Sequence, residues 1–472
     1  MAFWETVLNK FKPGKEQAPS DSLRSSFNSS RNSILHSSVC FAPSVNMIFS
    51  ENGTIKACCH NSENALGRYP QNSINEIWHS EDAQRFRQKM EEYHFLSGCG
   101  VCERDYKHGN FNEMPARHFD NLPRHAAYPT MMEFMLSNTC NLECVMCSGE
   151  LSSSIRRNRD KLPPIESPYD DEFLAQLKDF MPYLTETRFS SSGEAFLIDM
   201  NFKLWEMLIE SNPSCQIVVQ TNGTLLNARV KDFLRRGNFK IGVSLDSLQK
   251  QTFEAIRVNA SFEKVMQNIE YFAAYCTAKK ERLTISTCVM RQNWKELPDF
   301  VTYCNKLGAY ATFHKVWAPL EFAIHNLPAD QLHEIYNELS AYKFTQQSFI
   351  EKKNSEHYNY FVSLIGTWAH AAEHNLSSEN FAEYKVEDLM IFVKQKLKAH
   401  VSAQNMLEED TQALAMMCEN KIDGVMGLCN SDEQRKQRLI SLASIPVQLS
   451  FPAIKNNSTE KLFEMSGVSH SS

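Results

Sequence analysis

The sequence predicts an α/β fold in which parallel strands are buried under helices. Between residues 130 and 320, apolar strand-like runs alternate with segments of helical periodicity, in units of roughly 30 residues. Six such units suit a partial barrel. A cysteine-rich stretch with short β-type runs precedes this core and suggests a small α+β domain, and a charged, mostly helical region follows it.

The elements of the core can be placed from apolar periodicity alone. The expected strands cover residues 131–136, 187–191, 216–221, 240–245, 283–290 and 311–316. The expected helices between them cover residues 171–182, 200–211, 228–236, 262–278 and 294–307. Because ligands of parallel α/β proteins bind beyond the carboxyl ends of the strands, functional residues are expected in the loops that follow these strands.

Length and charge limit the classes of protein to consider. The 472 residues are enough for two to four domains, at about 150 residues per domain. The formal net charge of -7 argues against nonspecific binding to nucleic acid. The chain shows no secretory leader and no apolar run of about 18 residues, so we expect a soluble cytoplasmic protein that does not bind membranes.

Fourteen cysteines require an explanation in a reducing compartment, where clustered cysteines are metal ligands or catalytic groups before they are disulfides. Three of them, Cys140, Cys144 and Cys147, follow the first core strand with the spacing C-x3-C-x2-C. This spacing suits one face of an iron–sulfur cube, which normally takes four cysteines, so one iron would remain open to a substrate or cofactor. A zinc site completed by a distant residue also fits the spacing.

The remaining cysteines fall into two groups. Cys99 and Cys102 form a C-x2-C pair that, together with two cysteines elsewhere, supplies four thiolates for a second metal centre, and zinc satisfies the same count. Cys40 and the neighbours Cys58 and Cys59 precede this pair, and Cys59 competes with Cys58 as a ligand. A hairpin is expected here, because Asn52-Gly53 lies between two short β-type runs. The others are expected to be small buried residues: Cys215, Cys276, Cys288, Cys304, Cys418 and Cys429.

The motifs that follow the triad resemble those of a known family. Ser192-Gly193-Glu194, Thr221-Asn222-Gly223 and Ser244-Leu245-Asp246 each end an apolar run, and with the triad they resemble the radical S-adenosylmethionine (SAM) enzymes. Gly53-x4-Cys58, Ile77-Trp78 and Cys99-x2-Cys102 are similar to the auxiliary cluster domain of the twitch/SPASM branch. That domain usually follows the core, whereas here it comes first, and His108 stands where a fuller SPASM pattern has a further cysteine.

The resemblance implies a set of cofactors. The triad would hold three irons of a [4Fe-4S] cluster, SAM would chelate the fourth, and reduction would cleave SAM to a 5′-deoxyadenosyl radical. The implied ligands of a second, auxiliary [4Fe-4S] cluster are Cys40, Cys58, Cys99 and Cys102. The implied SAM contacts are Ser192, Gly193 and Glu194 for the amine, Thr221 and Ser244 for the ribose or methionyl part, Arg257 for the carboxylate and Val289 for adenine.

These observations predict five segments and one favoured function. The segments are a flexible stretch 1–38, an auxiliary cluster domain 39–125, a radical SAM core 126–320, a helical region 321–454 and a disordered tail 455–472. The favoured function is hydrogen abstraction from a peptide or protein side chain, with an external one-electron donor. The alternatives are a small-molecule biosynthetic enzyme and an iron–sulfur protein that binds its clusters without turnover. The sequence identifies no catalytic acid or base.

Overall fold

A computed structural model describes residues 21–31, 37–61, 63–107, 109, 111, 114–378, 385–402, 408–444, 454–455 and 458–466. The chain divides into two compact units. The first contains Met1–Ile324 and Asn337–Val362, and the second contains His325–Tyr336 and Ser363–Ser472. Among the described residues, no helix combines the length and the apolar character that crossing a bilayer requires.

The first unit is built on one nine-stranded sheet with the order β3-β2-β1-β4-β5-β6-β7-β8-β9. Its strands are β1 (Asn46–Phe49), β2 (Thr54–Lys56), β3 (Ala65–Arg68), β4 (Met131–Phe134), β5 (Glu186–Phe189), β6 (Gln216–Thr221), β7 (Phe239–Ser244), β8 (Thr284–Val289) and β9 (Tyr310–Lys315). From β4 to β9 every neighbouring pair is parallel and follows chain order. The six expected core strands are these six, and the predicted α/β fold is confirmed.

The cysteine-rich region contributes three strands to this same sheet. The expected hairpin forms, with β1 antiparallel to β2 and Gly53 in the left-handed region at φ 84°. Strand β1 also pairs in parallel with β4, through Phe49 and Phe134, whose rings stack 5.2 Å apart. The hairpin therefore extends the core sheet and shares its hydrophobic core.

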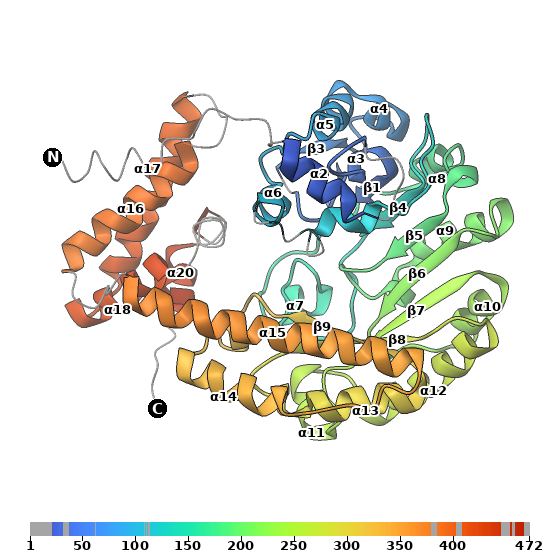
Figure 1. Cartoon of the computed structure of the whole chain (residues 1–472). Coiled ribbons are helices and arrows are strands. Elements are labelled where there is room, and N and C mark those ends of the chain that lie inside the picture. Colours follow the sequence, from blue (N-terminus) through green and yellow to red (C-terminus); the bar gives the residue numbers. More distant parts are fainter. Residues whose placement is uncertain are drawn as a thin grey trace. The chain divides into compact units, whose positions relative to one another are not determined.

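Helices cover one face of the sheet. The helices of the first unit are α2 (Asp21–Ser29), α3 (Ala42–Val45), α4 (Ile74–His79), α5 (Glu81–Glu91), α6 (Gly100–Lys107), α7 (Ser153–Asn158), α8 (Asp171–Leu177), α9 (Asp199–Ser211), α10 (Ala228–Arg236), α11 (Lys250–Ile256), α12 (Phe262–Ala278) and α13 (Leu297–Leu307). Figure 1 shows α8, α9, α10 and α12 along the same side of the sheet. Apolar residues of these helices, such as Trp205 and Phe272, are fully buried against the strands.

The opposite face of the sheet, which we call the inner face, is polar. Along β6 the buried residues Ile217, Val219 and Thr221 alternate with half-buried Gln216 and Gln220. The register pairs carry this alternation across the neighbouring strands. The inner-face residues include Asn46, Glu133, Arg188, Gln220, Ser244, Ser286 and Thr312. An interior lined with hydrogen-bonding groups is suited to a polar ligand.

Part of the segment expected to be flexible is ordered. In helix α2, Phe27 is fully buried and its ring lies 5.2 Å from that of Tyr106. Beyond the helix, Arg31 forms a buried ion pair with Asp120. The expectation failed for residues 21–31 because one aromatic side chain and one buried charge pair fix a segment whose average composition is polar. Residues 1–20, 32–36 and His108 lie outside the described residues.

The second unit is helical, as expected. Its helices include α16 (Val386–Ser402), α17 (Glu408–Gly427), α18 (Asp432–Ser444) and α20 (Thr459–Ser466), while α14 (Ala329–Ser340) and α15 (Phe349–Ser378) have residues in both units. Leu389, Cys418 and Leu439 are fully buried in a separate hydrophobic core. Helix α20 falls inside the tail expected to be disordered, and it buries Leu462.

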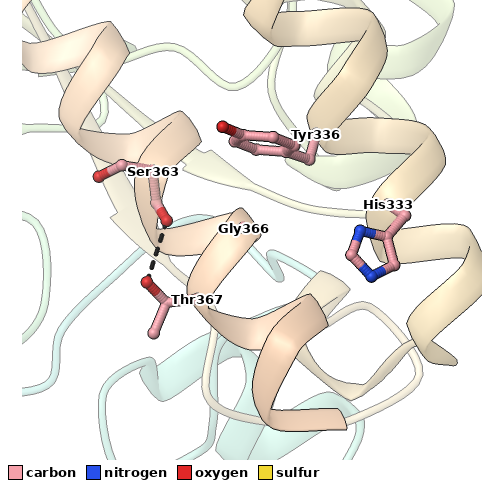
Figure 2. A pocket seen from close by; sticks show the side chains of 5 residues that line it. All are labelled: His333, Tyr336, Ser363, Gly366 and Thr367. Atoms are coloured by element: carbon pink, nitrogen blue, oxygen red, sulfur yellow. Dashed lines mark hydrogen bonds between the residues drawn. The ribbon is translucent and has the colours of Figure 1, made fainter. Parts of the chain in front are cut away.

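A pocket in the second unit lies between α14 and α15. Figure 2 shows His333 and Tyr336 from α14 facing Ser363, Gly366 and Thr367 from α15. A side chain at Gly366 would bring its Cβ to 3.0 Å from the Tyr336 ring, so the glycine permits this close packing. None of the five lining residues is a cysteine, and the cysteine chemistry predicted from the sequence lies in the first unit.

Candidate functional site

The loop of the cysteine triad is held by the start of helix α7. The backbone N–H of Cys140 donates to Ser153 Oγ at 3.2 Å, and Ser154 Oγ donates to the Cys140 carbonyl at 2.8 Å. Ser152 Oγ donates to the Leu142 carbonyl at 2.7 Å. Three consecutive serines thus fix the backbone around the first thiol. Cysteine spacing alone did not single them out, although Ser152 is the N-cap of α7.

The far side of the triad loop is fixed by the segment that carries Arg257. The N–H groups of Glu143 and Val145 donate to the carbonyls of Val258 and Ile256 at 3.0 and 2.9 Å. The Arg257 guanidinium lies beside the middle thiol, with Nη1 3.9 Å from Cys144 Sγ. Arg257 therefore reaches the predicted site.

Arg257 is already engaged in the protein, which its expected role did not anticipate. Its Nε lies 2.7 Å from Asp246 Oδ2, and both side chains are buried. Burial opposes the charge of Arg257, yet Asp246 and the neighbouring thiols outweigh burial and raise its pKa. A contact with the SAM carboxylate would have to use the remaining guanidinium nitrogens. The contacts that the structure shows link Asp246 to the triad loop through Arg257.

The triad thiols are half-buried, and burial disfavours their charged form. Burial raises the pKa of Cys144 to about 12, against the opposing effect of Arg257, and it also raises the pKa of Cys140 and of Cys147. A metal must displace these protons, because the thiolate is the ligand. The donor set of three neighbouring thiols is suited to iron in that form.

Gly193 brings its loop directly onto the triad loop. Its φ is 66°, and a Cβ on this residue would lie 2.7 Å from the Ser137 carbonyl oxygen and 2.8 Å from that of Thr139. The next residue donates its N–H to the same Thr139 oxygen at 2.7 Å. Only glycine fits this contact without displacing the backbone that leads to Cys140. The predicted motif is thus placed beside the triad.

Glu194 is fully enclosed by hydrogen-bond donors from the next loop. Its carboxylate accepts from Thr221 Oγ1 at 2.6 Å, from the Asn222 N–H at 2.7 Å and from the Phe196 N–H at 3.2 Å. Burial raises its pKa, and these donors oppose the shift. Thr221, expected to contact the ribose or methionyl part of SAM, donates its hydroxyl to Glu194, and its contact with SAM stays a prediction. Three hydrogen bonds to the carboxylate leave one acceptor site unused, which could serve a further donor such as an ammonium.

Asn222 connects the third predicted loop to the first thiol. Its Nδ2 lies 3.9 Å from Cys140 Sγ and donates to Asn141 Oδ1 at 3.0 Å. Asn141 in turn donates to Thr224 Oγ1 at 3.0 Å. In the sequence Asn222 is only part of a turn motif, and its contact with Cys140 depends on the parallel arrangement of the strands.

The strand-end residues of β7 and β8 divide between the two faces. Ser244 lies on the inner face and accepts a hydrogen bond from Gln220 at 2.9 Å. Val289 is fully buried on the opposite face of β8, so its placement does not support the expected adenine contact.

Cys288 departs from its expected role. It is partly exposed on the inner face, where it interacts electrostatically with Cys144 and Cys147. Cys215, Cys276, Cys304, Cys418 and Cys429 are buried, as expected.

The four thiols expected to form the auxiliary site line one cavity. Cys40, Cys58, Cys99 and Cys102 surround it, together with His60 and Asn61. Asn61 Nδ2 lies 3.1 Å from Cys99 Sγ. Burial raises the pKa of Cys102 to about 11 and also raises that of Cys40. Cys59 is exposed and lies outside the lining, which favours Cys58 of the two. Within the described residues, no three His, Cys, Asp or Glu side chains are close enough together to hold a single metal ion.

Comparison with known families agrees with both sites. Residues 134–304 match the radical SAM superfamily, and residues 40–104 match the SPASM iron-sulfur cluster-binding domain. The chain carries a radical SAM domain preceded by a SPASM domain. These two domains imply a SAM-binding [4Fe-4S] cluster, an auxiliary cluster and SAM, and the three thiols of the triad and the four of the cavity have the donor chemistry that such clusters require.

Curated relatives match only part of this chain. A GTP 3′,8-cyclase of Clostridium botulinum is 24% identical over 186 residues, which are 39% of this chain and 56% of the relative. A probable GTP 3′,8-cyclase of Methanocella arvoryzae is 30% identical over 142 residues, 29% of this chain and 42% of the relative. The chain thus spans about half of the length of these relatives.

Solved structures give partial matches of the same kind. The structure of native anSMEcpe with bound AdoMet has a TM-score of 0.34 and 19% identity, and the match covers 44% of this chain and 59% of that one. Streptococcus suis SuiB bound to its precursor peptide SuiA has a TM-score of 0.32 and 13% identity, over 58% of this chain and 53% of that one.

Proposed function

We propose that this protein is an enzyme that reductively cleaves SAM and abstracts a hydrogen atom from a peptide or protein side chain. When bound, the cluster and SAM supply the 5′-deoxyadenosyl radical. The observation that carries the proposal is the convergence of two strand-end loops and the end of helix α11 on the thiols: Gly193 meets the Thr139 carbonyl, Asn222 lies beside Cys140, and Arg257 lies beside Cys144.

The residues of the chain position SAM and the triad. The Thr221 hydroxyl and the Asn222 N–H fix the Glu194 carboxylate, which keeps one direction open for the ammonium of SAM. Asp246 fixes Arg257, whose guanidinium holds positive charge beside Cys144 and would be available to pair with the methionyl carboxylate of SAM. These groups are buried and rigidly paired, so the site is arranged before SAM binds.

A peptide or protein substrate is favoured by the SPASM domain and by the polar inner face. The resemblance is to the auxiliary-cluster branch, which contains many peptide maturases. The inner face of the sheet, from Asn46 to Thr312, also carries hydrogen-bonding groups that are suited to a peptide. A small-molecule substrate is the second candidate, because the curated relatives are named GTP 3′,8-cyclase. An auxiliary cluster held by four thiols would have no open iron, and we assign it the electron that leaves the product radical.

Anaerobic reconstitution with iron and sulfide, followed by reduction in the presence of SAM, tests the proposal. Sustained formation of 5′-deoxyadenosine supports an enzyme, whereas cluster absorbance without SAM cleavage would leave only a cluster-binding protein. Replacing Cys140, Cys144 and Cys147 with Ala should abolish cleavage and leave about four irons per chain at the auxiliary site. Cys276→Ala, which alters a buried cysteine of α12 outside both sites, is the matched control.

The substrate class is tested separately. Peptides encoded next to the gene, with deuterium at their Cα and side-chain Cβ positions, should transfer deuterium to 5′-deoxyadenosine. Transfer of deuterium from deuterated GTP, with none from the peptides, would favour the small-molecule candidate.

A further inference from the structure

A group of charged residues on the inner face belongs to neither cysteine site. Register pairs place Glu133 of β4 directly beside Arg188 of β5, and Glu186 lies on the same face two residues earlier. Arg188 Nε donates to Glu186 Oε1 at 2.5 Å. Neither family motif includes these residues, and Arg188 places a guanidinium on the central strand of the sheet.

Arg188 is oriented by its neighbours and keeps part of its surface open. Its side chain is 35% exposed, and the contact to Glu186 occupies Nε alone. Within the part of the chain that the structure describes, neither of its two Nη atoms makes a hydrogen bond. A guanidinium held along one edge by a carboxylate presents its other edge as a fork that matches a carboxylate or phosphate.

The second carboxyl group of the cluster, Glu133, is half-buried and hydrogen-bonded. Glu133 accepts a hydrogen bond from Asn46 Nδ2 at 2.8 Å, and burial raises its pKa against the effect of Arg188. A carboxyl that holds its proton more readily repels an anionic ligand less. At the same level of the sheet, the register pairs add Lys56 on one side and Lys240 on the other.

The cluster also lies within reach of both cysteine sites. Arg188 precedes Ser192 by four residues, so their Cα atoms are at most about 14 Å apart. His60, which lines the auxiliary cavity, acts electrostatically on Glu133. A group bound at Arg188 would therefore be held on the strand that leads into the loop of the predicted SAM site.

We propose that Arg188, oriented by Glu186, anchors an acidic group of the substrate, a carboxylate or a phosphate, on the inner face of the sheet. The inference deepens the proposed function, because it names the chemistry by which the substrate is held. Arg188 acts as a binding residue, with the fork of the guanidinium as the element that recognises the anion.

Binding of three blocked tripeptides to the reconstituted full-length protein tests this inference without turnover. The probes are acetyl-Gly-Glu-Gly-amide, its phosphoserine counterpart and its neutral glutamine counterpart, each followed by saturation-transfer NMR and equilibrium dialysis. In the wild type, at least one anionic probe should bind about tenfold tighter than the glutamine probe. The tighter of the two anionic probes identifies the acidic group as carboxylate or phosphate.

Two substitutions and a control test whether Arg188 causes the preference for the anionic probes. Arg188→Gln should abolish it, and Arg188→Lys, which keeps the charge but not the fork, should retain only part of it. Arg235→Gln removes an arginine that is paired with Asp232 on the exposed surface of α10, and it should leave the preference unchanged. If Arg188→Gln does not fold, the ranking of wild type above Arg188→Lys remains the test.

Equal binding of the three probes by the wild type, or a preference that persists in Arg188→Gln, would overturn the inference. Failure of the proposed function is detected in a different assay, as the absence of 5′-deoxyadenosine formation by the wild type. The two outcomes are therefore independent.

Discussion

Gly193→Ala is the substitution whose effect can be worked out most directly. The backbone at this position has φ 66°, a region that costs a residue with a Cβ roughly 1–2 kcal/mol. The new Cβ would lie 2.7 and 2.8 Å from the carbonyl oxygens of Ser137 and Thr139, so the backbone must move. Movement would strain the hydrogen bond from the Glu194 N–H to Thr139, which contributes about 1 kcal/mol. The expected loss of stability is roughly 2–4 kcal/mol.

Gly308→Ala separates the conformational cost from the clash. Gly308 has nearly the same φ, 68°, but the nearest atom to its Cβ is the flexible end of Arg282, at 3.4 Å. This control should lose only the roughly 1–2 kcal/mol of the backbone conformation. Any excess in Gly193→Ala measures the contact with the triad loop.

Calorimetric unfolding of the two apo variants measures these costs, and the initial rate of 5′-deoxyadenosine formation measures the consequence for the site. Because displacement of about 1 Å at a reacting centre costs on the order of a hundredfold in rate, Gly193→Ala should lose at least that much. Gly308→Ala should keep the wild-type rate. Equal stability and equal rates in the two variants would refute the argument that Gly193 is required by its contact with the triad loop.

Three further results are expected. Arg257→Met should destabilise the protein by about 3–5 kcal/mol in a denaturant titration, because it leaves Asp246 buried and unpaired, and Arg257→Lys should recover part of this. Glu194→Gln should weaken SAM binding at least about tenfold in a dialysis assay, because the amide replaces an acceptor that faces the Asn222 N–H. The apo protein should lose stability as the pH rises from about 9 to 12, because folding then retains a proton on Cys144. The iron-loaded protein should not show this loss, because its Cys144 binds iron as the thiolate. The folded chain keeps the Cys144 proton, with a pKa of about 12, while the unfolded chain releases it near 8.5, and scanning calorimetry across this range measures the loss.

The core of the fold was predictable because apolar residues recur with a different period in its strands than in its helices. The six core strands were expected within a few residues of β4 to β9, since each is an apolar run between helical segments. The attachment of the hairpin to β4 was not predictable, because it depends on Phe49 meeting Phe134 across a long sequence separation. Helix α2 was missed for the same reason, since the partners of Phe27 and Arg31 lie about eighty residues away.

The positions of the site residues were easier to predict than their partners. Spacing predicted that the triad and the loops at the strand ends form one site, and the structure brings these residues together. Spacing could not show that Asp246 holds Arg257 or that Thr221 donates to Glu194. These contacts depend on how far each loop reaches over the sheet. Cys288 was misread because an apolar strand has two faces, and only the register shows that its thiol lies on the inner one.

The shared sheet explains how a SPASM domain that precedes the core can still serve it. Cys40 comes before β1, and Cys58 follows β2, which runs antiparallel to β1, so both lie near the amino end of β1. The triad follows the carboxyl end of β4, which is parallel to β1. The two cysteine sites therefore flank a strand pair about 13 Å long, at roughly 3.3 Å per residue, with Glu133 of the inner face between them. A substrate on that face would lie between the two cysteine sites, to which we assign radical generation and electron uptake in the proposed function, whatever the order of the two domains in the chain.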